Sequence, residues 1–181
     1  MSKWQRLSGK IVYQNNYMSV HEDEVIAPDG RATVYGWIET PPAVFIVALG
    51  DQDRVCLVEQ ERYTTGAPSW EIPAGNTDGE DDTDAAKREL AEEAGLHADK
   101  WERLPVQTYP FNGFAAERNI IFIATGLHQV REPVGATDDT ITAKRWVSWP
   151  ELKKMLSKGE ITDAQTISAV MLAGLHLGHI K

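Results

Sequence analysis

The pattern of hydrophobic and polar positions predicts a run of strands interrupted by one helix and closed by two more. Residues 44–49 form a continuous apolar run, which is typical of a strand buried on both faces of a sheet. Residues 55–60 follow after a short polar turn and are expected to pair with it. Further strands are expected near residues 70–75, 103–109, 119–125 and 143–148.

The first forty residues have a different pattern. Apolar and polar side chains alternate over residues 17–22, and Pro28-Asp29-Gly30 marks a turn. Residues 31–39 then form the expected return strand, which Pro41-Pro42 ends. We therefore expect an N-terminal β-hairpin appendage at residues 1–40 and a main domain at residues 41–181.

The clearest predicted helix covers residues 85–94. Acidic side chains precede it, where the helix dipole favours negative charge, and Thr83 or Asp82 is the expected N-cap. Gly95 supplies the C-terminal stop. Two further helices are expected from Pro150 to about residue 156 and over residues 163–177. The order of elements predicts an α/β (α+β) fold, a three-layer sandwich with a mixed β-sheet.

Composition narrows the classes of function. The 181 residues fit one domain with a small appendage, and the formal charge of −9 makes nucleic-acid binding an unexpected role. A small anionic substrate would need arginines, backbone N–H groups or metal ions. The single cysteine, Cys56, lies in an apolar run and is expected in the core. No signal peptide or membrane-spanning run is visible, so we expect a cytoplasmic protein.

Three glutamates lie on one stripe of the predicted helix. Glu89, Glu92 and Glu93 are three and four residues apart, so their carboxylates share about a third of its circumference. Such a stripe is a solvated acidic face in many proteins, with Arg88 and Glu92 as a weak i,i+4 pair. Alternatively, the carboxylates supply the hard oxygen ligands that Mg²⁺ prefers.

The residues around these glutamates resemble the Nudix box. The family pattern is Gly, five residues, Glu, seven residues, Arg-Glu-aliphatic, any, Glu-Glu, any, Gly-aliphatic. Here it is matched by Gly75, Glu80, Arg88-Glu89-Leu90, Glu92-Glu93 and Gly95-Leu96. Only four residues, rather than five, separate Gly75 from Glu80, so we expect an altered loop before an intact helix. We call residues 75–96 the box.

The resemblance implies roles for the box residues. Mg²⁺, with Mn²⁺ as a substitute, would be bound by the carboxylates of Glu89, Glu92 and Glu93 and the backbone carbonyl of Ala74. Arg88 would pair with a box glutamate, and Gly75 and Gly95 would be structural. Glu80 is a candidate catalytic residue, although an orienting or salt-bridging role fits it better. The bound metal would polarise a diphosphate and activate water.

Residues outside the box resemble one branch of the family, the pyrophosphatases of ADP-ribose and nucleoside diphosphate sugars. The similar segments are residues 60–63, residues 70–75, Pro110 and Glu117-Arg118. The branch implies hydrolysis of the substrate to a nucleoside monophosphate and a sugar phosphate. It also implies a homodimer formed through the N-terminal strands.

The resemblance suggests substrate-binding residues and a base. Arg62 is expected to bind the diphosphate, the alternative being a surface arginine, and Glu117 is expected to contact substrate or metal, the alternative being a pair with Arg118. The branch places its general base on the loop before the last strand. Asp139 or Asp138 on this loop would act as the base, unless both are ordinary turn residues. The box residue Glu92 is the alternative.

Two other functions fit the sequence. One is a Nudix hydrolase of another nucleotide, such as a dinucleoside polyphosphate. The other is a non-catalytic Nudix module that senses a nucleotide. The complete set of box carboxylates argues against the second, because a module without metal gains nothing from three mutually repelling side chains.

Overall fold

The computed structural model describes residues 3–130 and 140–181. It divides into two compact units. The first unit comprises Met1–Pro42 and Tyr109–Arg118, and the second unit comprises Ala43–Thr108 and Asn119–Lys181. Residues 109–118 were expected in the main domain, whereas in the structure they belong to the first unit.

The first unit is an antiparallel three-stranded sheet in the order β1-β2-β3. Its strands are β1 (Gln5–Gln14), β2 (Ser19–Ile26) and β3 (Ala32–Glu39). The predicted hairpin was therefore incomplete, because it omitted β1. Every residue of β1 is exposed, so its sequence lacks the buried alternation that marks a half-buried strand. Residues 109–118 contact β3, where the Ile38 N–H donates to the Phe114 carbonyl at 2.7 Å.

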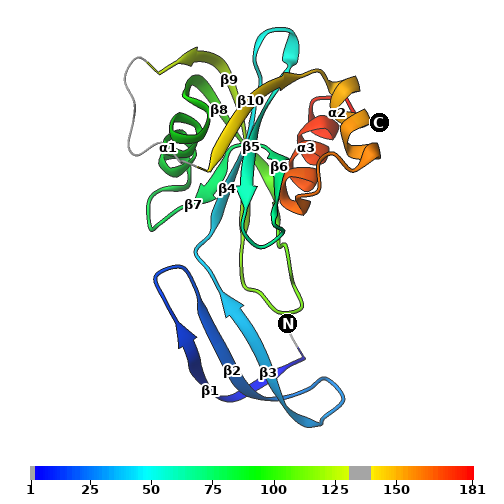
Figure 1. Ribbon diagram of the computed structural model, residues 1–181. Coiled ribbons are helices and arrows are strands. Elements are labelled where there is room, and N and C mark those ends of the chain that lie inside the picture. Colours follow the sequence, from blue (N-terminus) through cyan, green and yellow to red (C-terminus); the bar gives the residue numbers. More distant parts are fainter. Residues whose placement is uncertain (1–2, 131–139) are drawn as a thin grey trace. The chain divides into compact units, whose positions relative to one another are not determined.

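The second unit contains two sheets (Figure 1). The four-stranded sheet has the order β7-β4-β9-β8, and the three-stranded sheet has the order β10-β5-β6. Strands β4 and β9 are parallel and the other pairs are antiparallel, which confirms the predicted mixed sheet. The strands are β4 (Ala43–Ala48), β5 (Val55–Arg62), β6 (Ala67–Glu71), β7 (Ala74–Asn76), β8 (Leu96–Thr108), β9 (Asn119–Gln129) and β10 (Ile141–Val147).

Among the described residues of the second unit, three α-helices cover the sheets. They are α1 (Asp82–Ala94), α2 (Trp149–Lys158) and α3 (Ala164–His176), and Figure 1 shows α1 on the opposite side of the strands from α2 and α3. Along β4, Phe45 and Val47 face the core that includes α2 and α3, whereas Val44 and Ile46 face the core that includes α1. The continuous apolar run of β4 is thus explained by burial on both faces. No helix in the described ranges is long and apolar enough to span a membrane.

Helix α1 begins at Asp82, three residues before the predicted stretch 85–94. Its N-cap is Asp81, not Asp82 or Thr83: the Asp81 backbone is extended and its carboxylate accepts from the Thr83 N–H at 2.9 Å. The first helical bond runs from the Ala85 N–H to the Asp81 carbonyl. Gly95 ends the helix with a φ of 64°, a left-handed conformation that glycine adopts without strain.

Two strand boundaries also differ from the prediction. The expected strand 70–75 is divided into β6 and β7, which lie in different sheets. Pro73 lies between them and has no N–H to donate to a ladder. Strand β8 starts at Leu96 rather than near residue 103. Its first half is an edge strand rich in charged side chains, and such a strand lacks a continuous apolar face.

Candidate active site

The loop that carries Gly75 to helix α1 is closed by a tight turn. The Glu80 N–H donates to the Thr77 carbonyl at 2.8 Å, and both central residues have positive φ: Asp78 at 49° and Gly79 at 85°. Positive φ at both positions is the mark of a type I′ turn, for which Asp-Gly is a favoured pair. The loop is one residue shorter than in the family pattern, and this tight turn spans the shorter distance. Glu80 therefore still lies directly before the N-cap of the helix, Asp81.

Arg88 is the centre of the box. Its guanidinium donates to Glu89 at 2.6 Å, to Glu92 at 3.2 Å and to Glu80 at 3.3 Å. A further bond of 2.9 Å reaches the backbone carbonyl of Asn76 in the loop. One arginine therefore joins three glutamates of the box to the loop that precedes it. This planar fork of donors cannot be reproduced by a lysine.

The same contacts shift the ionisation of the box side chains. Burial lowers the pKa of the Arg88 guanidinium, but the hydrogen bonds and charges of Glu89 and Glu80 outweigh it, so the pKa is raised overall. The pKa of Glu89 is also raised, first by burial, which Arg88 opposes and the charges of Glu92 and Asp78 reinforce. Burial is therefore the main reason that the ionised form of Glu89 is less favoured here than in water.

Gly75 provides the space that Glu89 occupies. A Cβ atom on residue 75 would lie 2.1 Å from Glu89 Oε1 and 2.2 Å from its Cδ. The φ of Gly75 is not in the left-handed region, so close approach rather than backbone conformation requires glycine here. A sequence pattern shows that the residue is glycine, but only the structure identifies the side chain that excludes a larger one.

Glu93 is oriented by the loop on the same side of the helix. Its carboxylate accepts from the Ala74 N–H at 2.8 Å. Glu89, Glu92, Glu93 and Ala74 are thereby brought together in the second unit, with oxygen atoms of the type that Mg²⁺ binds. Within the described ranges, however, no three His, Cys, Asp or Glu side chains are arranged to hold a metal ion as they stand. Glu89 and Glu92 are turned toward Arg88, so binding a cation would replace contacts with the guanidinium.

Arg62 lies on β5 and is anchored by a residue that the sequence analysis did not single out. Glu71 on β6 accepts from Arg62 Nε at 3.0 Å and Nη2 at 2.5 Å, and only 4% of Glu71 is exposed. The hydrogen bond to Glu71 raises the pKa of Arg62 against the effect of burial, and the charges of Glu71, Asp163 and Glu93 raise it further. Arg62 therefore lies within the electrostatic reach of the box glutamate Glu93.

Side chains on β5 and β6 point alternately to the two faces of the sheet, and this alternation could have identified Glu71 as a partner of Arg62. Arg62 shares its face with Val58, and Glu71 is the register partner of Val58. A buried acidic residue at that position needs a cationic partner on the same face. Without the register of the two strands, however, the sequence does not show which cation this is.

The remaining predicted residues belong to the first unit, lie in the core or fall outside the described ranges. Glu117 belongs to the first unit, where it accepts a hydrogen bond of 3.3 Å from the Thr40 hydroxyl. Asp138 and Asp139 fall outside the residues that the structure describes. Cys56 is fully buried, as predicted, and burial raises the pKa of its thiol to about 12.

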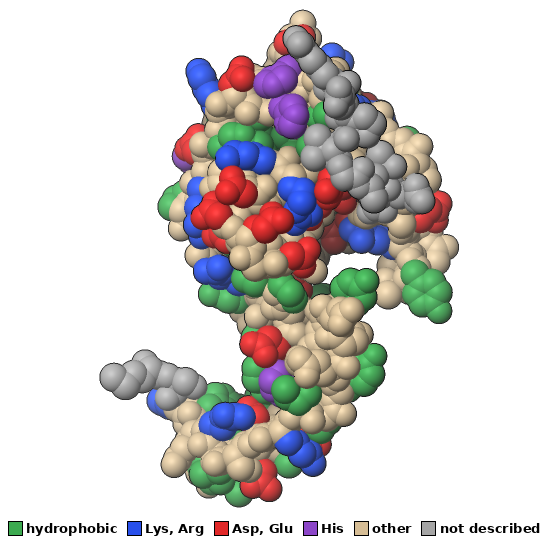
Figure 2. Space-filling model, turned by 90° about the vertical axis from the view of Figure 1, so that its left-hand side faces the viewer, with side chains coloured by type: hydrophobic (Ala, Val, Ile, Leu, Met, Phe, Trp, Pro, Cys, Tyr) green, Lys and Arg blue, Asp and Glu red, His purple; other side chains and the backbone are tan. Residues whose placement is uncertain are grey.

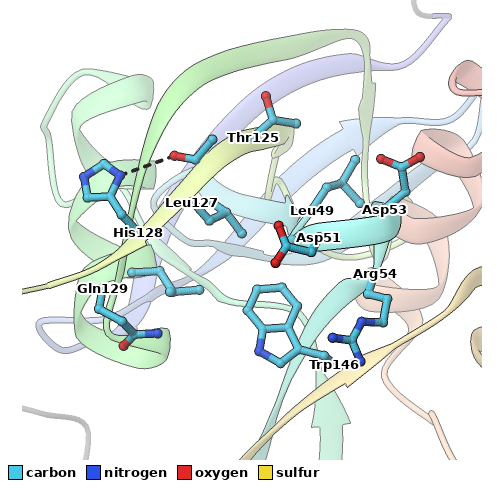
Figure 3. A pocket seen from close by; sticks show the side chains of 12 residues that line it. Leu49, Asp51, Asp53, Arg54, Thr125, Leu127, His128, Gln129 and Trp146 are labelled. Carbon is cyan, nitrogen blue, oxygen red and sulfur yellow. Dashed lines mark hydrogen bonds between the residues drawn. The ribbon is translucent and has the colours of Figure 1, made fainter.

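A cavity of about 470 Å³ lies elsewhere in the second unit, at the C-terminal ends of β4 and β9 (Figure 3). Its lining includes Leu49, Arg54, Thr125, His128 and Trp146, and none of its residues is one of the box glutamates. Gly75, at the start of the box, lies at the opposite end of β4, where it pairs with Val44. On the face that Figure 2 shows, acidic side chains are mixed with lysines and arginines rather than forming one continuous acidic patch.

Comparison with known proteins shows the class to which this fold and site belong. Residues 39–170 match the NUDIX domain model, and residues 4–38 match the model of the nucleoside diphosphate sugar hydrolase N-terminal domain. The chain belongs to the Nudix family and is a pyrophosphatase of the hydrolase class.

Similar proteins span nearly the whole chain. An ADP-ribose pyrophosphatase from Mycobacterium tuberculosis is 32% identical over 171 residues, which cover 93% of this chain and 82% of that protein. An ADP-ribose pyrophosphatase from Bacillus subtilis is 29% identical, covering 94% and 89%. A crystal structure of an ADP compounds hydrolase superposes with a TM-score of 0.85 at 21% identity, covering 99% of this chain and 96% of that one, and so shows the shared fold.

Proposed function

We propose that this protein is a Mg²⁺-dependent pyrophosphatase that hydrolyses the diphosphate linkage of ADP-ribose or a related nucleoside diphosphate sugar. The products would be a nucleoside monophosphate and a sugar phosphate. The observation that carries the proposal is the cluster in which Arg88 joins Glu80, Glu89 and Glu92 beside the Ala74–Glu93 contact. Support for the substrate class comes from the relatives named ADP-ribose pyrophosphatase and from the matching N-terminal model.

The metal site would use groups on helix α1 and on strand β7, the strand before it. The carboxylates of Glu89, Glu92 and Glu93 and the carbonyl of Ala74 would supply hard oxygen ligands. Mn²⁺ would serve as a substitute. A bound divalent ion neutralises charge on the diphosphate and lowers the pKa of a coordinated water.

The protein's own residues would bind the substrate and direct the water. Arg62, anchored by Glu71, would bind the diphosphate through its exposed edge, since 42% of its side chain is accessible. Glu80 would orient Arg88 rather than transfer protons. Glu92 or Asp139 would accept the proton of the attacking water, and Glu117 would contact the substrate or a metal.

A substrate panel tests this function. ADP-ribose, ADP-glucose, UDP-glucose, GDP-mannose and a dinucleoside polyphosphate would be incubated with the enzyme and either Mg²⁺ or EDTA, and the products separated by chromatography. We expect Mg²⁺-dependent release of a nucleoside monophosphate and a sugar phosphate. Turnover of only the dinucleoside polyphosphate would reassign the substrate, and binding without any turnover would favour the nucleotide-sensing module.

Variants assign the roles. Glu92→Gln and Glu93→Gln should each lower kcat/KM by at least about 100-fold, because they remove a ligand and not only its support. Glu160→Gln, a surface change just after the end of α2, is the control.

Arg62→Ala should raise KM, and the matched control is Arg145→Ala, which breaks the exposed pair with Glu151. Asp139→Asn compared with Glu92→Gln at several pH values would identify the base.

We also propose a homodimer formed through the first unit. The supporting observation is that β1 exposes large apolar side chains, with Leu7, Ile11 and Tyr13 each more than half accessible. Light scattering should give a mass twice that of the 20.1 kDa chain. Leu7→Asp combined with Ile11→Asp should yield a monomer, whereas an unchanged mass would place the interface elsewhere.

A further inference from the structure

Two histidines face each other across strands β8 and β9. His97 and His128 are register partners, and their ring centroids lie 5.7 Å apart with the ring planes tilted by 50°. Their neighbours Leu96 and Leu127 contribute to the core under α1, so the two histidines point to the other face of the sheet, because side chains alternate along a strand. Both imidazoles are exposed, so an ion from solution can reach them.

The hydrogen bond of His128 determines which of its ring nitrogens is free. Its Nδ1 lies 3.3 Å from the carbonyl oxygen of Gly126 (Figure 3). A carbonyl oxygen only accepts, so Nδ1 carries the proton, and the lone pair of the neutral imidazole is then on Nε2. Metal-binding histidines have this arrangement: one N–H donates to a carbonyl or carboxylate and thereby orients the other nitrogen toward the metal.

An acidic side chain lies beside the pair. Asp99 is two residues from His97 on β8 and shares its face, and Asp99 Oδ1 lies 3.8 Å from His128 Nδ1. Glycine at position 126 provides the space, since a Cβ atom there would lie 2.9 Å from Asp99 Oδ2. The carboxylate adds negative charge next to the two imidazoles and so favours a cation at this edge of the sheet.

The nitrogen donors select the kind of cation. Imidazole binds Zn²⁺, Ni²⁺ and Cu²⁺, whereas Mg²⁺ requires oxygen ligands. Two imidazoles that share one tetrahedral Zn²⁺ have their bound nitrogens about 3.3 Å apart. The two rings are within reach of that separation, because rotation of each exposed side chain turns a ring nitrogen toward the partner ring and shortens the distance below that of the centroids.

We propose that His97 and His128 form a binding site for a divalent transition-metal ion of the Zn²⁺ type, separate from the oxygen ligands of the box. The two imidazoles are the protein ligands, water completes the coordination, and Asp99 stabilises the ion through its charge. A site with two protein ligands agrees with the absence, among the described residues, of any group of three potential metal-binding side chains. Because the ligands come from neighbouring strands, the ion links the edge strand β8 to β9.

Calorimetric titration of the protein with Zn²⁺, in the presence of excess Mg²⁺ to occupy the box, tests this site. We expect one binding event per chain, and His97→Ala and His128→Ala should each weaken it by at least about tenfold, because each removes one of the two ligands. His176→Ala, an exposed histidine of α3, is the matched control and should bind Zn²⁺ as the wild type does. Glu93→Gln should also retain the binding event.

A second measurement locates the ion directly. Substoichiometric Cu²⁺, a paramagnetic ion with the same preference for imidazole, should broaden the imidazole NMR signals of His97 and His128 before those of His176 and His179. Equal broadening of all four would overturn the site, as would Zn²⁺ binding that persists in both His97→Ala and His128→Ala. Loss of the Zn²⁺ event in Glu93→Gln would assign the ion to the box instead.

Discussion

At the scale of single residues, the site requires a glycine at position 75, because a side chain there would collide with Glu89. Gly75→Ala would place a methyl group 2.1 Å from Glu89 Oε1, the atom that accepts from Arg88, and would displace that carboxylate. The backbone conformation tolerates alanine, so the fold should persist while a metal ligand is misplaced. We expect kcat/KM to fall by about 10- to 100-fold, measured with ADP-ribose and saturating Mg²⁺.

Gly36→Ala is the control for this substitution. Its added Cβ would meet only the His21 carbonyl oxygen at 3.9 Å, an ordinary contact, and its activity should match the wild type. Equal activity of Gly75→Ala and Gly36→Ala would show that Glu89 tolerates displacement and is not a critical ligand.

Cys56 gives a pH-dependent prediction at the same scale. Burial raises the pKa of its thiol from the ordinary value of 9.0 to about 12 in the folded protein. Above pH 9 the unfolded chain loses this proton before the folded protein does, so the folding free energy contributed by the neutral thiol is lost as pH rises toward 12. The thiol should therefore react with DTNB at pH 8 only after unfolding in guanidinium. Rapid reaction of the native protein would contradict the buried position.

At the scale of elements, Arg88 fastens helix α1 to the loop before it. Arg88→Lys keeps the charge but loses the planar fork that reaches Glu80, Glu89, Glu92 and the Asn76 carbonyl. We expect kcat/KM to fall by about 10- to 100-fold while α1 remains folded by its apolar face. Steady-state kinetics and circular dichroism would measure the two effects. The control is Arg103→Lys, whose partner Asp82 is the first residue of α1.

Elements were predictable from the sequence where neighbouring residues alone indicate the structure. The apolar run of β4 and the alanines and glycine of α1 determined those elements, because burial on two faces and helix termination are read from neighbouring residues. Strand β1 was missed because all its residues are exposed, and residues 109–118 because their contact with β3 joins distant segments. Within the site, the motif identified the glutamates, but the Arg62–Glu71 pair depends on the β5–β6 register.

At the scale of the whole molecule, metal binding should be visible in the stability of the fold. A ligand that binds only the folded state adds about 2.7 kcal/mol to the free energy of unfolding when its concentration is 100 times Kd. Mg²⁺ should therefore raise the Tm of the wild type, and EDTA should reverse the rise. Glu93→Gln should reduce it, whereas Glu160→Gln should not. Equal shifts in both variants would place the stabilising cation outside the box.

The two-sided burial of β4 has a consequence for how the second unit unfolds. Strands β4, β5 and β9 each give alternate side chains to the core under α1 and to the core under α2 and α3. Loss of either core therefore leaves half of every central strand without its packing. The two layers should melt as one cooperative unit, so the box helix cannot detach from a sheet that stays folded. Hydrogen-exchange rates in α1 and α3 should then approach a common slow limit set by global opening.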